Sequence, residues 1–136
     1  MAEQSEQNDS NEAIIAALGT QPSIELAILF GSHATGRARD DSDVDVAVDA
    51  GHPLDAEEKV ALISELATRT GRPVDLVDLH TVGEPLLGEI LRDGRRLLGS
   101  DTRYAEWICR HLHDAADFLP YVERMLAERR AAWLGK

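Results

Sequence analysis

The strongest constraint on this chain is a pair of apolar runs joined by a short polar segment, within residues 24–48. The first run, from Ile24 to Phe30, is rich in Ile, Leu and Phe, which predicts a strand that is buried on both faces. It stops at Gly31 and Ser32, where glycine lets the backbone turn sharply and approach a ligand closely. The N–H groups after this glycine and the serine hydroxyl can donate hydrogen bonds to phosphate oxygens. We therefore predict a turn that binds a triphosphate at the start of a short helix.

The second run, SDVDVAV at residues 42–48, alternates in polarity. Side chains alternate between the two faces of a strand, so Asp43, Asp45 and Ala47 should share one face and the valines the other. Two carboxylates spaced in this way stand roughly 6.5 Å apart and can converge on two cations that lie ~4 Å apart, the arrangement used for in-line phosphoryl or nucleotidyl displacement. Ligand sets made only of oxygen favour Mg²⁺. A lone Asp-x-Asp is more often a solvated acidic edge, so the neighbouring residues decide the interpretation.

Those neighbours form a longer pattern, in which ten residues separate Gly31-Ser32 from Asp43-x-Asp45. Other residues also occupy expected positions: Ala34, Gly36, Ala38 and Ser42. Over about residues 10–98 the chain resembles the minimal nucleotidyltransferases, a branch of the DNA polymerase beta superfamily. The resemblance implies an α/β (α+β) fold, a small mixed sheet flanked by helices. It also implies Mg²⁺-dependent transfer of a nucleoside monophosphate from an NTP, with two metal ions and three essential acids.

The third acid is expected in the short strand at residues 74–79, VDLVDL. Asp75 and Asp78 have opposite parity there, so only one of them can face the metals. The family's Val-Asp-Leu pattern implies that Asp75 is this residue, as a metal ligand and general base, and leaves Asp78 a structural role.

The remaining nucleotide contacts are expected in the loop between the turn and the acids. Arg37 and Arg39 carry guanidinium groups that can offset triphosphate charge. Ser42 belongs to the family pattern and is included among the nucleotide-binding residues. The predicted site combines two sets of residues: Gly31, Ser32, Arg37, Arg39 and Ser42 for the nucleotide, and Asp43, Asp45 and Asp75 for catalysis and metal binding.

Capping and turn signals predict the flanking helices. Asp9-x-x-Glu12 and Asp55-x-x-Glu58 read as capping boxes for helices that end before Gly19 and Gly71. Another helix should begin near Pro85, followed by a last edge strand at residues 95–98. We divide the chain into a disordered N-terminus at 1–8, a minimal nucleotidyltransferase domain at 9–99 and a C-terminal helical extension at 100–136.

The extension carries a heptad-like apolar seam. Its members are Ile108, Leu112, Ala115, Leu119, Val122 and Leu126. Pro120 interrupts the seam, which predicts two helices or one kinked helix. Most of the chain's aromatic residues lie here, and they favour an interface as strongly as packing back onto the domain. Cys109, His111 and His113 lack a fourth ligand, so we predict no zinc site.

Composition restricts the partners. The net charge of -11 argues against binding nucleic acid or an anionic membrane and favours a protein with a basic face. The single cysteine excludes an internal disulfide, and no apolar run approaches ~18 residues. We expect a cytoplasmic protein.

The resemblance further implies the antitoxin half of a HEPN/minimal-nucleotidyltransferase toxin–antitoxin system. Such a protein transfers AMP from ATP to a tyrosine of a HEPN-domain RNase toxin, with which we expect it to form a hetero-oligomer. Two alternatives stay open. One is an antitoxin that masks the toxin by binding alone, and the other is nucleotidyl transfer to a small molecule such as an aminoglycoside.

Overall fold

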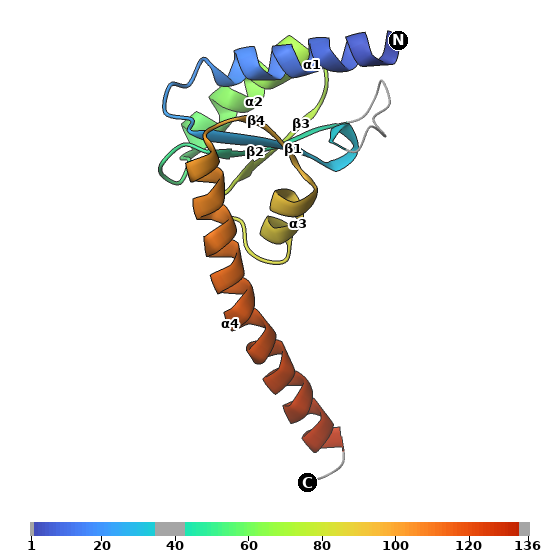
Figure 1. The fold of residues 1–136 in the computed structure, drawn as a ribbon, viewed down its shortest axis with the longest axis vertical. Helices are drawn as coiled ribbons and strands as arrows, with labels where there is room; N and C mark the ends of the chain where they lie inside the picture. The colour runs from blue at the N-terminus through green and yellow to red at the C-terminus, as the bar shows by residue number, and fades with distance from the viewer. Residues whose placement is uncertain (1, 35–42, 134–136) are drawn as a thin grey trace.

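The computed structural model describes residues 2–34 and 43–133 as a sheet with helices on both faces and a long C-terminal helix (Figure 1). In chain order the elements are α1 Ala2–Leu18, β1 Leu26–Phe30, the 3-10 turn η1 Gly31–His33, β2 Val44–Asp49, α2 Ala56–Thr70, β3 Val74–Asp78, α3 Leu86–Asp93, β4 Arg95–Leu98 and α4 Asp101–Trp133.

The sheet has the strand order β3-β2-β1-β4. β1 pairs antiparallel with both β2 and β4, whereas β2 and β3 run parallel. The sheet is therefore mixed, and the predicted fold class is confirmed. Its register places Asp45 beside Phe30 on one side and Asp75 on the other.

Two apolar cores lie on opposite faces of the sheet. Side chains of α1 and α2 pack against one face, where the three valines of β2 are buried. Ala47 belongs to the other core, with residues of α3 and the first turns of α4. The predicted parity of β2 is therefore correct, and Asp45, which shares the parity of Ala47, lies on the face that α3 and α4 cover only in part (Figure 1).

Local signals fixed the ends of α2 and α3. Asp55 and Glu58 form the predicted capping box, and Gly71 ends α2 with a left-handed φ of 67°. Pro85 precedes the first residue of α3, and β4 follows as an edge strand.

The N-terminal helix differs from its prediction. α1 begins at Ala2 rather than at Asp9, and residues 2–8, predicted to be disordered, are helical in the structure. The segment Ala2–Asn8 contains no glycine or proline, and its Ala, Glu and Gln residues favour the helix. The helix therefore extends past the capping pattern that we expected to start it.

The C-terminal extension is one helix of 33 residues with Pro120 inside it. Trp107 is 4% exposed in the second core, and Tyr104 and Ile108 pack against the same cluster. Beyond these turns α4 projects away from the body (Figure 1). The boundary predicted after residue 99 thus cuts through packed structure. No helix in the described ranges combines the length and apolarity of a membrane span.

Candidate active site

The predicted phosphate turn directly follows β1. Gly31 has a φ of 71°, a left-handed conformation that favours glycine. A Cβ atom at this position would lie 2.3 Å from Oδ2 of Asp45. The backbone conformation and the close approach of a carboxylate both require glycine here, so the turn and the acid form one unit.

Two of the three predicted acids lie side by side on one face of the sheet, and the third, Asp43, lies directly before β2. Asp45 and Asp75 are direct partners in the parallel β2–β3 pair, and paired strands stand ~4.8 Å apart. Asp43 precedes Asp45 by two residues and shares its parity. Asp45 is half-buried, whereas Asp43 and Asp75 are exposed. The fold therefore gathers the acids at an open edge that a nucleotide can reach.

Asp78 has the structural role that the family pattern left to it. It is 4% exposed, and its carboxylate accepts hydrogen bonds from the backbone N–H of Leu54 at 2.7 Å and of His80 at 2.9 Å. These bonds hold the loop before α2 and the turn after β3, on the face away from Asp75.

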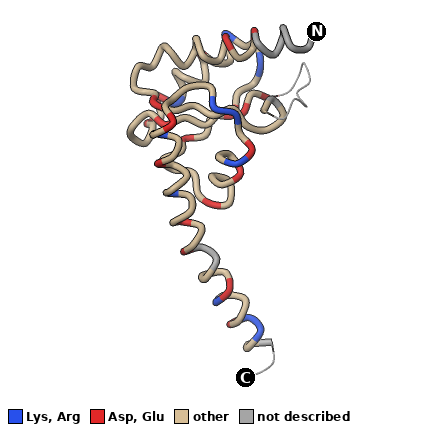
Figure 2. The backbone as a smooth tube through the Cα atoms, in the orientation of Figure 1, with Lys and Arg blue, Asp and Glu red and all other residues tan. Residues whose placement is uncertain are grey.

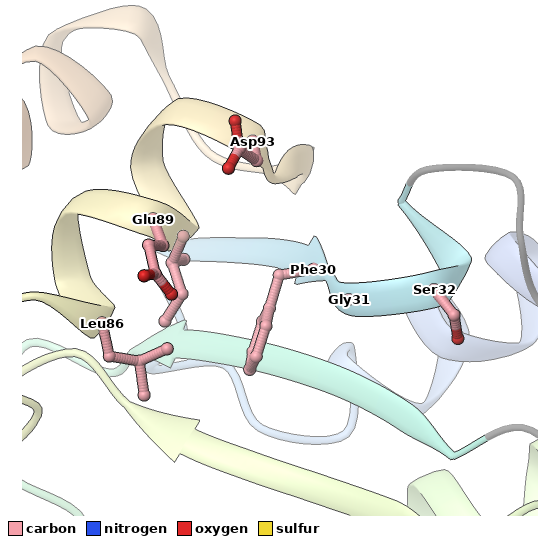
Figure 3. A pocket seen from close by; sticks show the side chains of 7 residues that line it. Phe30, Gly31, Ser32, Leu86, Glu89 and Asp93 are labelled. Atoms are coloured by element: carbon pink, nitrogen blue, oxygen red, sulfur yellow. The ribbon is translucent and has the colours of Figure 1, made fainter.

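A pocket of about 510 Å³ opens beside the turn, between β1, η1 and α3 (Figure 3). Residues of both the turn and α3 line it: Phe30, Gly31, Ser32, Leu86, Glu89, Ile90 and Asp93. Gly31 and Ser32 thus border this pocket, and Gly31 also contacts Asp45, which connects the pocket with the acids.

A family model described as polymerase beta, nucleotidyltransferase matches residues 12–103, which include the turn and all three acids. The chain belongs to this family. It is a nucleotidyltransferase, as the resemblance carried by the turn and the acids implied.

Individual relatives of this nucleotidyltransferase are also similar along most of their length. The protein adenylyltransferase MntA of Shewanella oneidensis is 33% identical over 95 residues, which are 70% of this chain and 68% of MntA. A chain from a toxin–antitoxin crystal structure with AMP-PNP is 26% identical with a TM-score of 0.79, covering 89% of this chain and 98% of that chain. Another matching chain comes from the solved structure of a tri-AMPylated Shewanella oneidensis HEPN toxin in complex with an MNT antitoxin. It is 28% identical with a TM-score of 0.68, and the match covers 88% of this chain and 98% of that chain.

The structural similarity extends beyond the family model. Coverage of 89% of the chain exceeds the share that ends at residue 103, so the match with the AMP-PNP structure must continue into α4. The long helix is therefore part of what this nucleotidyltransferase shares with chains solved in toxin–antitoxin structures.

Sequence reasoning missed a buried polar cluster that attaches α4 to the sheet. Asp49 is fully buried and accepts hydrogen bonds from Arg103 Nε at 2.6 Å and from Trp107 Nε1 at 2.8 Å. His80 Nε2 lies 2.6 Å from the other carboxylate oxygen of Asp49, and the backbone N–H of Gly51 donates to that same oxygen at 2.8 Å. Burial raises the pKa of Asp49, but these donors, led by Arg103, outweigh it and hold the pKa far below the ordinary value.

One sequence signal pointed to this cluster. Asp49 continues the parity of Asp43, Asp45 and Ala47, so it had to face α3 and α4, where a buried carboxylate needs partners. Those partners, Arg103 and Trp107, are more than 50 residues away along the chain. No local pattern could identify them.

The remaining nucleotide-binding predictions lie outside the described residues. Arg37, Arg39 and Ser42 belong to the segment 35–42, and they stay predictions.

Proposed function

We propose that this nucleotidyltransferase transfers AMP from ATP to a tyrosine of a HEPN-domain toxin and thereby acts as its antitoxin. The main support for the proposal is the close approach of Gly31 to Asp45, because it places the predicted phosphate-binding turn directly beside a predicted metal-binding carboxylate. The relatives support the choice of substrate. MntA is named a protein adenylyltransferase, and one similar structure holds an AMPylated HEPN toxin with its antitoxin.

The proposal gives each group a role. The N–H groups of the turn and the Ser32 hydroxyl hold the β- and γ-phosphates. Asp75 accepts the proton of the tyrosine hydroxyl while the phenolic oxygen attacks the α-phosphorus. The new bond joins that oxygen to phosphorus, and the bond to the β-phosphate oxygen breaks. Pyrophosphate then leaves on the side of Gly31 and Ser32.

The acids also fit Mg²⁺. Asp43, Asp45 and Asp75 offer only oxygen ligands from one face of the sheet, and when bound the metal would stabilise negative charge on the phosphates. Among the described residues, no group of three acidic, histidine or cysteine side chains is arranged to hold a metal ion alone. Mg²⁺ commonly takes one or two carboxylates together with substrate phosphates and water. We therefore propose that metal and ATP bind together, in the cytoplasm where ATP is supplied.

The decisive experiment is co-expression with the HEPN-domain toxin that the proposal makes the partner. Asp43→Asn combined with Asp45→Asn keeps side-chain shape but removes the charge that holds Mg²⁺. We expect mass spectrometry to find AMP on a toxin tyrosine with the wild type and none with this variant, whose cells should stop growing. Glu57→Gln with Glu65→Gln is the control, because it removes the same charge from α2 on the opposite face.

A second candidate function is masking of the toxin by contact alone. The projecting part of α4 favours it, since Leu112 is 61% exposed and Leu126 is 53% exposed, which suits a binding surface. Full protection by the Asp43→Asn, Asp45→Asn variant, with no AMP on the toxin beside the wild type, would establish masking instead of catalysis. Transfer to a small molecule has less support, because the described residues after β4 form one helix and no separate substrate domain.

A further inference from the structure

We propose that the outer edge of β3 binds an extended segment of the protein substrate as an added strand and so presents the acceptor tyrosine to Asp75. The inference rests on the proposed function and adds how the substrate is held. β3 is one of the two edge strands of the sheet, and it carries the acid that receives the tyrosine proton. β4, the other edge strand, is separated from β2 and its acids by β1.

The stereochemistry of the proposed reaction places the acceptor on the β3 side. In-line displacement requires the attacking oxygen and the leaving pyrophosphate to lie on opposite sides of the α-phosphorus. Pyrophosphate leaves at Gly31 and Ser32, directly after β1. β2 lies between β1 and β3 (Figure 3). The tyrosine therefore approaches from β3, where Asp75 is exposed.

The backbone of β3 offers hydrogen-bonding groups on its outer side. The carbonyl of Pro73 and the N–H of Leu79 both bond to the backbone of β2, at 2.8 and 2.9 Å. Because backbone groups alternate in direction along a strand, the odd-numbered residues between them also point toward β2. The N–H and C=O groups of Val74 and Leu76 therefore point outward, and nothing in the described part of the chain hydrogen-bonds to them. An added strand pairs with groups of this kind.

The same alternation brings an added strand closest at Asp75. The backbone groups of Asp75 point toward β2, so the opposite residue of an antiparallel added strand forms a non-hydrogen-bonded pair with it. Such pairs have Cα atoms ~4.5 Å apart and their side chains on one face. Asp45 is the register partner of Asp75 on the other side. A tyrosine opposite or diagonal to Asp75 thus extends over the face that carries both acids.

Charge favours a substrate segment over a second copy of this chain. Antiparallel pairing of two β3 strands would bring two Asp75 carboxylates close together, and like charges on neighbouring strands repel. The exposed Pro73 at the start of β3 also opposes pairing between copies. A substrate strand that carries a neutral tyrosine avoids this repulsion, and it can cover the half-buried side chains of Val74, Leu76 and Val77.

The first test measures AMP transfer from ATP with Mg²⁺ to the HEPN-domain toxin by the full chain. Leu76→Pro removes one outward N–H and places a ring at the outer edge, while the bonds between β2 and β3 remain. Leu76→Ala is the matched control, because it shortens the same side chain but keeps the N–H. We expect transfer by Leu76→Pro to be slower than transfer by Leu76→Ala by about tenfold or more. Isothermal titration calorimetry should give both variants the same affinity for ATP.

The second test does not need the proline variant to fold, which circular dichroism checks. Hydrogen exchange of the wild type, followed by NMR, compares the amide of Leu76 with that of Val77, whose N–H points toward β2. The Leu76 amide should exchange faster than the Val77 amide in the free chain. We expect its exchange to slow by about tenfold or more when the toxin is added without ATP, whereas the Val77 amide stays protected throughout.

Three results would overturn strand addition at β3. One is equal transfer by Leu76→Pro and Leu76→Ala, and another is exchange at Leu76 that the toxin does not slow. The third is slowing that depends on the concentration of this chain alone, which would assign the edge to a second copy. Absence of AMP on the toxin with the wild type would instead reject the proposed function, while the exchange measurement would still show whether the toxin occupies the edge.

Discussion

Gly31 and Gly71 share a backbone conformation but differ in their surroundings. Their φ values are 71° and 67°, so alanine would strain both turns to a similar degree. A Cβ at Gly31 would meet Asp45 at 2.3 Å, whereas nothing lies within 4 Å of one at Gly71. Comparing alanine variants of Gly31 and Gly71 therefore separates the effect of backbone strain from the effect of displacing the Asp45 carboxylate.

We predict that Gly31→Ala abolishes transfer of AMP, because the methyl group must push Asp45 out of place. Gly71→Ala should lower the free energy of unfolding by about 1 kcal/mol and leave transfer intact. The measurements are urea unfolding and labelling of the partner with radioactive ATP. Comparable loss of transfer in both variants would mean that strain alone, and not contact with Asp45, explains the requirement for glycine.

Asp49 gives the stability of the protein a specific dependence on pH. Its folded-state pKa is lowered, so its contribution is fully present above the unfolded-state value of about 3.9 and is lost as the pH falls toward the folded-state value. We predict that Asp49→Asn lowers the free energy of unfolding at pH 7 by about 2 kcal/mol, because Arg103 and Trp107 lose a charged hydrogen-bond acceptor.

The difference between wild type and Asp49→Asn should shrink below about pH 4. Urea unfolding measured from pH 7 down to pH 3 tests this, with Asp93→Asn as the exposed control. A difference that stays constant over this range would show that the ionised carboxylate is not the source of the stability.

Parity explains which single residues could be predicted. Alternation along β3 required Asp75 and Asp78 to lie on opposite faces, since a strand offers only two, and the family's Val-Asp-Leu pattern then selected Asp75 as the partner of Asp45. The same reasoning gave the direction of Asp49 but not its partners, because Arg103 and Trp107 reach it only through tertiary packing.

Among the elements, α4 divides into an attached and a projecting part. Trp107 is buried, and the Tyr104 hydroxyl donates to the carbonyl of Leu91. His111 Nδ1 lies 2.5 Å from a Glu84 carboxylate oxygen, and a Cβ on Gly88 would touch the His111 ring. The helix is therefore part of the fold through about residue 111.

We predict that a chain ending at residue 115 keeps Mg²⁺-dependent ATP binding but loses transfer to the partner protein. The shortened chain retains the contacts of the attached part, while loss of the projecting surface removes the proximity that accelerates transfer. Calorimetry with ATP and mass spectrometry of the partner measure the two effects. A chain ending at residue 99 is the contrast, and it should lose its cooperative thermal transition because Trp107 leaves a core position. Normal AMP transfer by the chain ending at 115 would reject a role for the projecting helix.

Element boundaries were predictable where local chemistry sets them. Asp55, Glu58 and Gly71 define α2 through bonds within a few residues, so its ends agree with the prediction. The start of α1 was misjudged because a capping pattern is only one signal, and a favourable sequence before it lets the helix continue. For α4 the seam suggested two helices or one kinked helix, and Pro120 lies within a single helix.

At the scale of the whole molecule, the net charge of -11 should control how fast a basic partner is captured. Acidic residues are spread over the body and along α4 (Figure 2). We predict that the association rate constant falls by about tenfold or more between 50 mM and 500 mM NaCl, while the dissociation rate changes much less. Stopped-flow mixing with the HEPN protein measures both. An association rate that is insensitive to salt would indicate that apolar contacts alone direct the encounter.

The attachment of α4 through Asp49 has a consequence for how such proteins can diversify. Its anchor lies at the base of the helix, whereas a 33-residue helix spans about 50 Å, so its far end lies remote from the sheet. Substitutions near that end leave both the anchor and the catalytic acids unchanged. If the projecting part of α4 docks the partner, as we propose, a lineage can exchange one partner for another by altering the outer half of α4 while the enzyme at its base is inherited intact.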